Sequence, residues 1–395
     1  MNSILLAIVL TAATPPFRVQ TLDGRTLLGP LVELTADRLA IDAADGRVSL
    51  DAEQLLWISA PRKPAPARLT TGVVVELTDG STILGRQYVA QAAQARITLS
   101  DGEVLETPTS IVRTVQLQQQ SGVPAAEWAR LIDMKVDSDL LVLRKDQSID
   151  YHRGILHDVT EDAVRFDLDG EVLPVKRSKV YGFAYRHGGQ IELPPAACRI
   201  TDSAGSQWSV RSLRLSEKLQ WTTPAGLSVA QAADKIVQID FSGGKIVYLS
   251  DVKPETVRWM PYFGAGKPPA AVEQFYAPRY DRNFDSGTLQ LGGTPYPKGL
   301  ALHSRTELVY RLPDRFRRFR AIVGIDDAVR PGGNVRLILR GDGKELLDVA
   351  VAGSDAPRPV DVDLTGIRRL TIVVDFGDSL SAGDYLLLCN ARLSK

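Results

Sequence analysis

The sequence is poor in the residues that build disulfide scaffolds and metal clusters. It contains two cysteines and four histidines among 395 residues. A secreted disulfide framework needs more cysteines, in closer pairs, so this class of protein is excluded. Cys198 and Cys389 fall in different predicted domains. Cys389 ends the apolar run 385–389, which predicts a buried thiol.

The common motifs of catalysis are also missing. The chain has no HExxH, CxxC, GxSxG or Walker motif, so no zinc centre, nucleophile elbow or phosphate loop is expected. His152 and His157 are five residues apart in predicted strands, which places them on opposite faces. The acidic residues lie beside turns or on alternating strands, where turn caps and hydrophilic faces explain them better than a hydrolytic pair. We therefore predict a protein that is not an enzyme.

Charge and hydropathy exclude further classes. The 47 lysines and arginines balance the 47 aspartates and glutamates, so nothing favours nucleic acid or an anionic membrane. The alternating arginines of 315–320 are typical of a strand with a solvated face. Residues 1–13 resemble a short secretory signal with an apolar core, and no later run is long enough to span a bilayer. We expect a secreted, periplasmic or cell-surface protein.

What the sequence does contain is alternating strands separated by glycine turns. In the N-terminal half, an Asp-Gly turn followed by Leu-Gly and an alternating strand recurs, first at Asp23-Gly24 and then at Asp79-Gly80. Each copy predicts about five short strands, and bent strands of this kind close into small barrels that loosely resemble Sm-like barrels. Pairs of copies that merge into larger sheets are an open alternative. The predicted small β-barrel-like repeats are 17–60, 70–118, 139–187 and 196–244.

Two linkers separate these copies. Residues 60–66 form a proline-rich spacer. The linker 119–138 contains a predicted short helix, because Pro124 lies near its start and Trp128, Leu131 and Ile132 share one helical face.

Residues 247–395 carry the most distinctive turns of the chain. These are Leu291-Gly292-Gly293, Tyr296-Pro297-Lys298-Gly299, Leu302-His303-Ser304, Gly324-Ile325-Asp326-Asp327 and Gly341-Asp342-Gly343-Lys344. Strands such as 335–340 and 360–364 alternate between apolar and polar residues, so each has one buried face. Two sheets of such strands, packed face to face, form a jelly-roll β-sandwich. The predicted fold is all-β, an array of small β-barrel-like repeats followed by a C-terminal jelly roll.

In order and spacing these turns resemble the NPCBM family of carbohydrate-binding modules over residues 247–395. The resemblance implies a galactose-binding-like jelly roll of a kind often attached to glycoside hydrolases. One departure stands out. The family closes with a Gly-Asp-His step and an acidic, tryptophan-bearing strand, whereas this chain has Gly383-Asp384-Tyr385, with Leu388 at the tryptophan position and Asn390 at a later acid.

Sugar recognition needs an aromatic ring for the apolar sugar face and fixed polar groups for the hydroxyls. The aromatic candidates are Trp259, Tyr262, Tyr276 and Tyr296. The polar candidates are Lys298, His303, Asp326, Asp327 and Asp384. A structural interpretation stands beside this one, because buried polar side chains in small sandwiches usually hold loops. In that case His303 locks a turn, and the two adjacent aspartates cap a loop.

These observations favour a non-catalytic exported protein that binds a glycan or polysaccharide at the cell envelope. One alternative is a structural or protein-interaction role among envelope proteins, with sugar binding lost. Another, weaker one is an accessory of glycoside hydrolases. A structural calcium would need about six or more oxygen ligands, and no compact acidic loop supplies them, so no cofactor is predicted.

Overall fold

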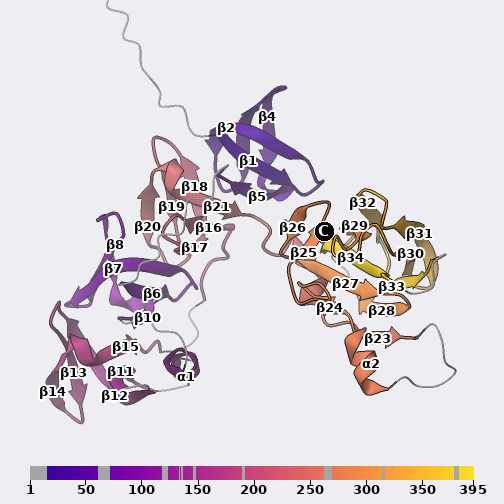
Figure 1. Ribbon diagram of the computed structural model, residues 1–395. Coiled ribbons are helices and arrows are strands. Elements are labelled where there is room, and N and C mark those ends of the chain that lie inside the picture. Colours follow the sequence, from indigo (N-terminus) through magenta and orange to yellow (C-terminus); the bar gives the residue numbers. More distant parts are fainter. Residues whose placement is uncertain are drawn as a thin grey trace, which may run out of the picture. The chain divides into compact units, whose positions relative to one another are not determined.

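The computed structural model describes residues 16–60, 72–117, 123–132, 134, 137–145, 148–188, 192–261, 269–313, 316–377 and 382–395. The predicted signal segment 1–13 and Tyr262 lie outside these ranges. The chain divides into two compact units, Met1–Gly243 and Gly244–Lys395. Both consist almost entirely of strands, which confirms the all-β prediction (Figure 1). Within the described ranges, neither α-helix has the length and apolar character needed to cross a membrane.

The N-terminal unit contains four segments of strands. The first has β1 (Pro16–Thr21), β2 (Thr26–Leu34), β3 (Arg38–Ala43), β4 (Gly46–Asp51) and β5 (Leu55–Ser59); the second has β6 (Val73–Leu77), β7 (Thr82–Gln91), β8 (Gln94–Leu99), β9 (Val104–Pro108) and β10 (Val112–Gln116). The third has β11 (Asp139–Lys145), β12 (Ser148–Val159), β13 (Ala163–Leu168), β14 (Glu171–Lys176) and β15 (Val180–Ala184); the fourth has β16 (Cys198–Asp202), β17 (Gln207–Val210), β18 (Ser212–Leu215), β19 (Leu219–Thr222), β20 (Ser228–Gln231) and β21 (Ile236–Asp240). Helix α1 (Val123–Ile132) lies between the second and third segments.

All four segments pair their strands in one order: last, first, second, third, fourth. The long second strand bends sharply, and in the fourth segment it is broken into β17 and β18. A glycine allows this bend in three segments. A Cβ at Gly29 would lie 1.9 Å from the carbonyl oxygen of Asp42, and one at Gly85 would lie 2.8 Å from that of Thr98. Gly154 makes the same kind of approach, 2.0 Å from the carbonyl oxygen of Asp167, although it follows an arginine. The Leu-Gly pattern of the sequence therefore marks a close approach of two backbones.

The segments are joined in pairs through their last strands. β5 pairs with β21, centred on Ile58 and Ile239, and β10 pairs with β15, centred on Val115 and Phe183. The flanking hydrogen bonds are reciprocal: Leu117 N donates to Tyr181 O (2.9 Å) and Tyr185 N to Arg113 O (3.0 Å). Larger sheets therefore replace isolated barrels, and each pairing covers edges that would otherwise be exposed.

A different contact joins the second and fourth segments. Ser81 and Ser206 each follow a glycine turn, and both are fully buried. Leu84 N donates to the hydroxyl oxygen of Ser206 (3.1 Å), and Ser209 N donates to that of Ser81 (3.0 Å). These two reciprocal bonds give a partner to two backbone N–H groups and two serine hydroxyls. Buried polar groups need such partners.

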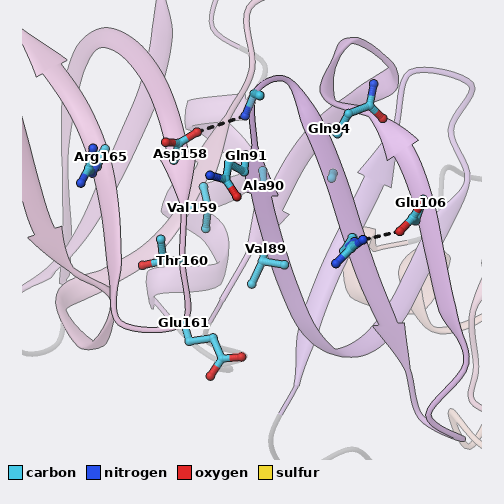
Figure 2. A pocket seen from close by; sticks show the side chains of 13 residues that line it. Val89, Ala90, Gln91, Gln94, Glu106, Asp158, Val159, Thr160, Glu161 and Arg165 are labelled. Carbon is cyan, nitrogen blue, oxygen red and sulfur yellow. Dashed lines mark hydrogen bonds and ion pairs between the residues drawn. The ribbon is translucent and has the colours of Figure 1, made fainter.

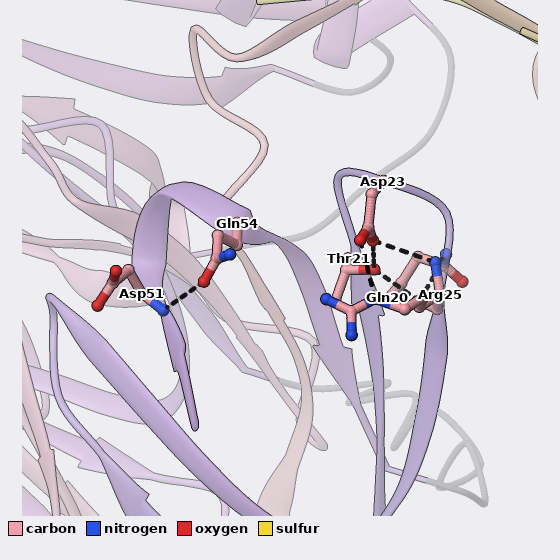
Figure 3. A network of polar contacts seen from close by, with 6 residues as sticks. All are labelled: Gln20, Thr21, Asp23, Arg25, Asp51 and Gln54. Carbon is pink, nitrogen blue, oxygen red and sulfur yellow. Dashed lines mark hydrogen bonds and ion pairs between the residues drawn. The ribbon is translucent and has the colours of Figure 1, made fainter. Parts of the chain in front are cut away.

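The corresponding turn of the first segment has a different chemistry. Arg25 occupies the place of the serine, and its guanidinium binds the Asp23 carboxylate at 2.8 Å (Figure 3). The Thr21 hydroxyl donates to the Arg25 carbonyl oxygen (3.0 Å), and Gln20 contacts the same oxygen. Both charged side chains are about half exposed. This network therefore closes the turn on itself and leaves it in solvent.

The C-terminal unit begins with β22 (Ile246–Tyr248). Its other elements are β23 (Thr256–Trp259), α2 (Ala270–Phe275), β24 (Arg279–Tyr280), β25 (Leu289–Leu291), β26 (Thr294–Tyr296), β27 (Gly299–His303), β28 (Thr306–Arg311), β29 (Arg318–Ile325), β30 (Asn334–Gly341), β31 (Lys344–Ala352), β32 (Arg358–Asp363), β33 (Arg369–Phe376) and β34 (Tyr385–Ser394).

Two sheets face each other in this unit. One has the order β24–β27–β34–β29–β32, with β22 also on β34, and the other has the order β23–β28–β33–β30–β31. Alternate residues of both sheets, such as Leu302, Leu386 and Leu337, fill one core between them. The β25–β26 hairpin covers the outer face of the first sheet, where Leu387 and Cys389 are buried beneath it. The predicted buried thiol of Cys389 is thus confirmed.

Candidate functional site

A chain of buried polar groups connects three distant segments of the C-terminal unit. The Ser304 hydroxyl donates to Asp384 Oδ2 (2.6 Å), and Asn334 N donates to Asp384 Oδ1 (3.1 Å). The indole N–H of Trp259 donates to the Ser304 carbonyl oxygen (2.9 Å), and the same oxygen contacts His303 Nδ1. Ser304 and Asp384 are both almost inaccessible to solvent. This chain fixes the position of the aromatic rings around it.

The rings form two stacks that meet at His303. Tyr276 lies on Trp259, with centroids 4.8 Å apart and planes inclined by 20°, and it also contacts His303 at 4.2 Å. Phe284 lies on Tyr385 at 4.7 Å and 30°. His303 and Tyr385 are direct cross-strand partners of β27 and β34, with rings 5.6 Å apart. Trp259 and His303 are buried, whereas Tyr276, Phe284 and Tyr385 are half-buried.

A second buried carboxylate lies beside this cluster. Asp326 is 2% exposed, and its backbone N–H donates to the Tyr385 carbonyl oxygen (2.9 Å). Burial raises the pKa of the Asp326 carboxyl, and the nearby charges of Asp285 and Asp327 act in the same direction. Burial likewise raises the pKa of Asp384, against the hydrogen bond from Ser304. The cluster therefore combines reachable ring faces with polar groups that are held in place.

The structure describes eight of the nine candidates from the sequence, all but Tyr262, and brings five of them together. Trp259, Tyr276, His303 and Asp384 belong to the connected cluster, and Asp326 adjoins it through Tyr385. Trp259 is 9% exposed and lies beneath Tyr276. Tyr276 is therefore the ring that a sugar can reach, and Trp259 supports it.

Lys298, Asp327 and Tyr296 lie elsewhere. Lys298 Nζ binds the carboxylates of Asp251 (2.5 Å) and Asp281 (2.8 Å), which fixes the start of β27. His303 is at the other end of that strand, roughly 13 Å away at the usual strand rise.

Asp327 and Tyr296 serve the β25–β26 hairpin. The Asp327 carboxylate accepts hydrogen bonds from Gly292 N and Gly293 N, both at 2.8 Å, and so holds the hairpin turn. Tyr296 packs against the apolar residues under the hairpin. Asp327 therefore holds the hairpin turn, whereas Asp326 Oδ1 caps the loop that follows it, by accepting a hydrogen bond from Ala328 N (3.1 Å).

Sequence reasoning did not select Phe284, Ser304 and Tyr385. Ser304 directly follows the candidate His303, and Tyr385 directly follows the candidate Asp384. The structure also shows where two of the departures from the family pattern lie. Leu388 is fully buried in the sandwich core, so it touches no site, whereas Tyr385 occupies the cluster itself.

A cavity in the N-terminal unit is the other candidate. It encloses about 710 Å³ and lies where β7 and β8 face the turn between β12 and β13 (Figure 2). Arg96 binds Glu106 at 2.8 Å along its wall, and Ala92 N donates to the Asp158 carboxylate (3.2 Å). No aromatic side chain is among its described lining residues, so it lacks the stacking surface that a sugar needs. In the described ranges of the whole chain, no group of acidic, histidine or cysteine side chains could hold a metal ion.

The chain is similar to several known proteins. A putative endo-alpha-N-acetylgalactosaminidase of Renibacterium salmoninarum is 27% identical over 212 residues, which is 50% of this chain and 14% of that protein. Two solved structures are similar. The CBM51 module of Clostridium perfringens GH95 in complex with methyl-galactose is 23% identical, with a TM-score of 0.32, over 38% of this chain and 99% of that chain. The tandem CBM51 modules of Sp3GH98 from Streptococcus pneumoniae SP3-BS71 are 13% identical, with a TM-score of 0.32, over 84% of this chain and 92% of that chain.

The family comparison concerns the C-terminal unit. The NPCBM/NEW2 domain family matches residues 260–394, a range that runs from the residue after Trp259 to the end of β34 and contains most of the aromatic cluster. Residues 260–394 of this chain are an NPCBM/NEW2 domain.

Proposed function

We propose that the C-terminal unit binds a glycan at the aromatic cluster and does not turn it over. The observation that carries this proposal is the half-buried Tyr276 ring, stacked on buried Trp259 above the Ser304–Asp384 chain. A sugar ring packs its apolar face on such an aromatic ring, and fixed polar groups at its edge select the hydroxyls.

The rest of the chain has a supporting role in this proposal. The protein is exported by its N-terminal segment, and the joined sheets of the N-terminal unit act as a spacer or docking surface. The relative from Renibacterium salmoninarum guides the choice of probe, because its name specifies alpha-N-acetylgalactosamine. Glycans that contain this sugar are therefore the first to test.

The test is affinity electrophoresis of the full chain on immobilised glycans. We expect retention that falls about tenfold in Tyr276→Ala, because an aromatic stack contributes roughly 0.5–1.5 kcal/mol beyond its buried area. Tyr296→Ala is the matched control, since its ring lies under the hairpin, and its retention should equal that of the wild type. Retention unchanged in Tyr276→Ala, or absent on every glycan, would contradict the proposal. Turnover of chromogenic glycosides would contradict its non-catalytic part.

A protein partner is the second candidate, and one observation favours it. Val272 and Phe275 of α2 are 38% and 54% exposed, and the Phe275 ring meets Tyr276 edge-on. Exposed apolar side chains of this kind are typical of contact surfaces. Pull-down from an envelope extract that survives Tyr276→Ala and fails in Phe275→Ser would support this role.

A further inference from the structure

A row of four side chains crosses the face of the first C-terminal sheet that is turned away from the core. Tyr248 of β22 is the cross-strand partner of Arg392 on β34, Arg392 is the partner of Arg320 on β29, and Arg320 is the partner of Asp361 on β32. The neighbours of Arg392 in the strand, Ala391 and Leu393, fill the sandwich core. Because side chains alternate along a strand, Arg392 projects from the opposite face.

Arg392 is a buried cation whose Nε atom has no acceptor. The residue is 9% exposed, and Nε contacts no hydrogen-bond partner in the part of the chain that the structure describes. The nearest acid in the row is already engaged, since Asp361 Oδ1 binds Arg318 (2.8 Å) and Oδ2 binds Arg320 (3.0 Å). Burial, and then the charge of Arg320, lower the pKa of the Arg392 guanidinium.

A second buried group without a partner lies on the same face. Ser394 follows Arg392 by two residues, is 1% exposed, and its hydroxyl oxygen makes no hydrogen bond to any described residue. Both groups can donate. Leaving a donor unpaired in the interior costs free energy, and leaving a charge unpaired costs more. Arg318 and Arg320 share the Asp361 carboxylate, Arg392 lies opposite Arg320, and Asp363 is exposed beside Arg318, so three arginines face two carboxylates and the face has an excess of positive charge.

We propose that this row binds a tetrahedral oxyanion, with the Arg392 guanidinium as its main ligand and the Ser394 hydroxyl as a further donor. A guanidinium presents two parallel N–H groups to two oxygens, and a tetrahedral anion offers a third oxygen to the hydroxyl. The anion is inorganic sulfate or the sulfate ester of a sugar, which share this chemistry. The row becomes more exposed towards β32, from Arg392 through Arg320 to Asp361, whose side chain is 39% exposed. The site is distinct from the aromatic cluster, because Arg392 is seven residues along β34 from Tyr385, about 20 Å of extended strand.

Isothermal titration of the full chain with sodium sulfate, at constant ionic strength against chloride, tests the site. We expect saturable binding that Arg392→Lys weakens at least tenfold, because lysine keeps the charge and loses the paired N–H groups. Ser394→Ala should weaken it about threefold. Arg336→Lys is the control, since Arg336 lies on the other sheet and is paired with Asp348 (2.5 Å), and it should bind as the wild type does.

Two further measurements distinguish the free sulfate ion from the sulfate ester of a sugar. The first measures retention on a sulfated galactan, and the second on the same polymer without sulfate. If the wild type is retained only on the sulfated polymer, and Arg392→Lys is not retained, the ligand is the sulfate ester. If the wild type binds sulfate in the titration but is not retained on the sulfated polymer, the ligand is the free sulfate ion. Tyr276→Ala should leave both results unchanged, which separates this site from the proposed glycan site. Equal sulfate affinity in the wild type, Arg392→Lys and Ser394→Ala would overturn the proposal.

Discussion

Each unit of this protein contains a buried aspartate beside a serine and a tryptophan, and the two sets do different things. In the N-terminal unit, Asp202 accepts hydrogen bonds from Ser206 N (2.9 Å) and from the indole N–H of Trp208 (3.1 Å). In the C-terminal unit, Asp384 accepts the Ser304 hydroxyl, and the Ser304 carbonyl oxygen accepts the Trp259 indole.

The difference lies in sequence separation and in the surroundings. The partners of Asp202 are two to six residues away, so this carboxylate holds one turn, and Trp208 packs edge-on against buried Trp221 (5.6 Å). The partners of Asp384 are 50 and 80 residues away, and the tryptophan of this set lies beneath a half-buried tyrosine. The same three residue types therefore build a turn in one unit and support an open aromatic surface in the other.

The largest expected effect concerns Asp202, whose hydrogen-bond partners are close to it in the sequence. Asp202→Ala leaves three buried donors without an acceptor, and we expect the free energy of unfolding of the N-terminal unit to fall by about 3 kcal/mol. Urea unfolding of the full chain measures this loss. The C-terminal unit, which contains Trp259 alone of the five tryptophans, should keep its own transition and its glycan retention.

A smaller change tests the other aspartate. Asp384→Asn keeps the shape of the side chain and one carbonyl oxygen, so one of two buried bonds is lost, and we expect a cost of about 1–2 kcal/mol in the C-terminal unit. Glycan retention should fall as well, because Ser304 positions Trp259 and His303. Loss of stability with unchanged retention would break the comparison, since Asp384 would then be as purely structural as Asp202.

The smallest expected effect is a decrease in the free energy of unfolding of the C-terminal unit as the pH rises. Burial raises the folded-state pKa of Asp326 and of Asp384 above 3.8, so the folded unit binds their protons more tightly than the unfolded chain does. Their contribution to stability is complete below pH 3.8 and is lost as the pH rises through the folded pKa values. We expect Asp326→Asn to flatten this fall in the unfolding free energy, measured in urea at a series of pH values. An equally steep fall in the variant would show that other groups cause it.

The sequence predicted the strands and turns well because these depend on neighbouring residues. The alternation of 335–340 became β30, and the Leu-Gly pairs became the bends of the long strands. It could not separate Lys298 from His303, which are only five positions apart in the sequence. Lys298 directly precedes the extended strand β27, and His303 ends it. One end is held by ion pairs, and the other enters the aromatic cluster.

By itself, the sequence determined that this is an all-β protein, since alternation and turn chemistry act over a few residues, and the order and spacing of the turns in residues 247–395 carried the resemblance to the NPCBM family. Only the tertiary structure decided which conspicuous residues meet. The register of β27 on β34 places His303 opposite Tyr385, and a slip of one residue would move one of them to the other face. The tertiary structure also left Arg392 Nε and the Ser394 hydroxyl, two residues apart on the outer face, without a hydrogen-bond partner among the described residues. Contacts across dozens of residues depend on the packing of whole sheets, which no local pattern encodes.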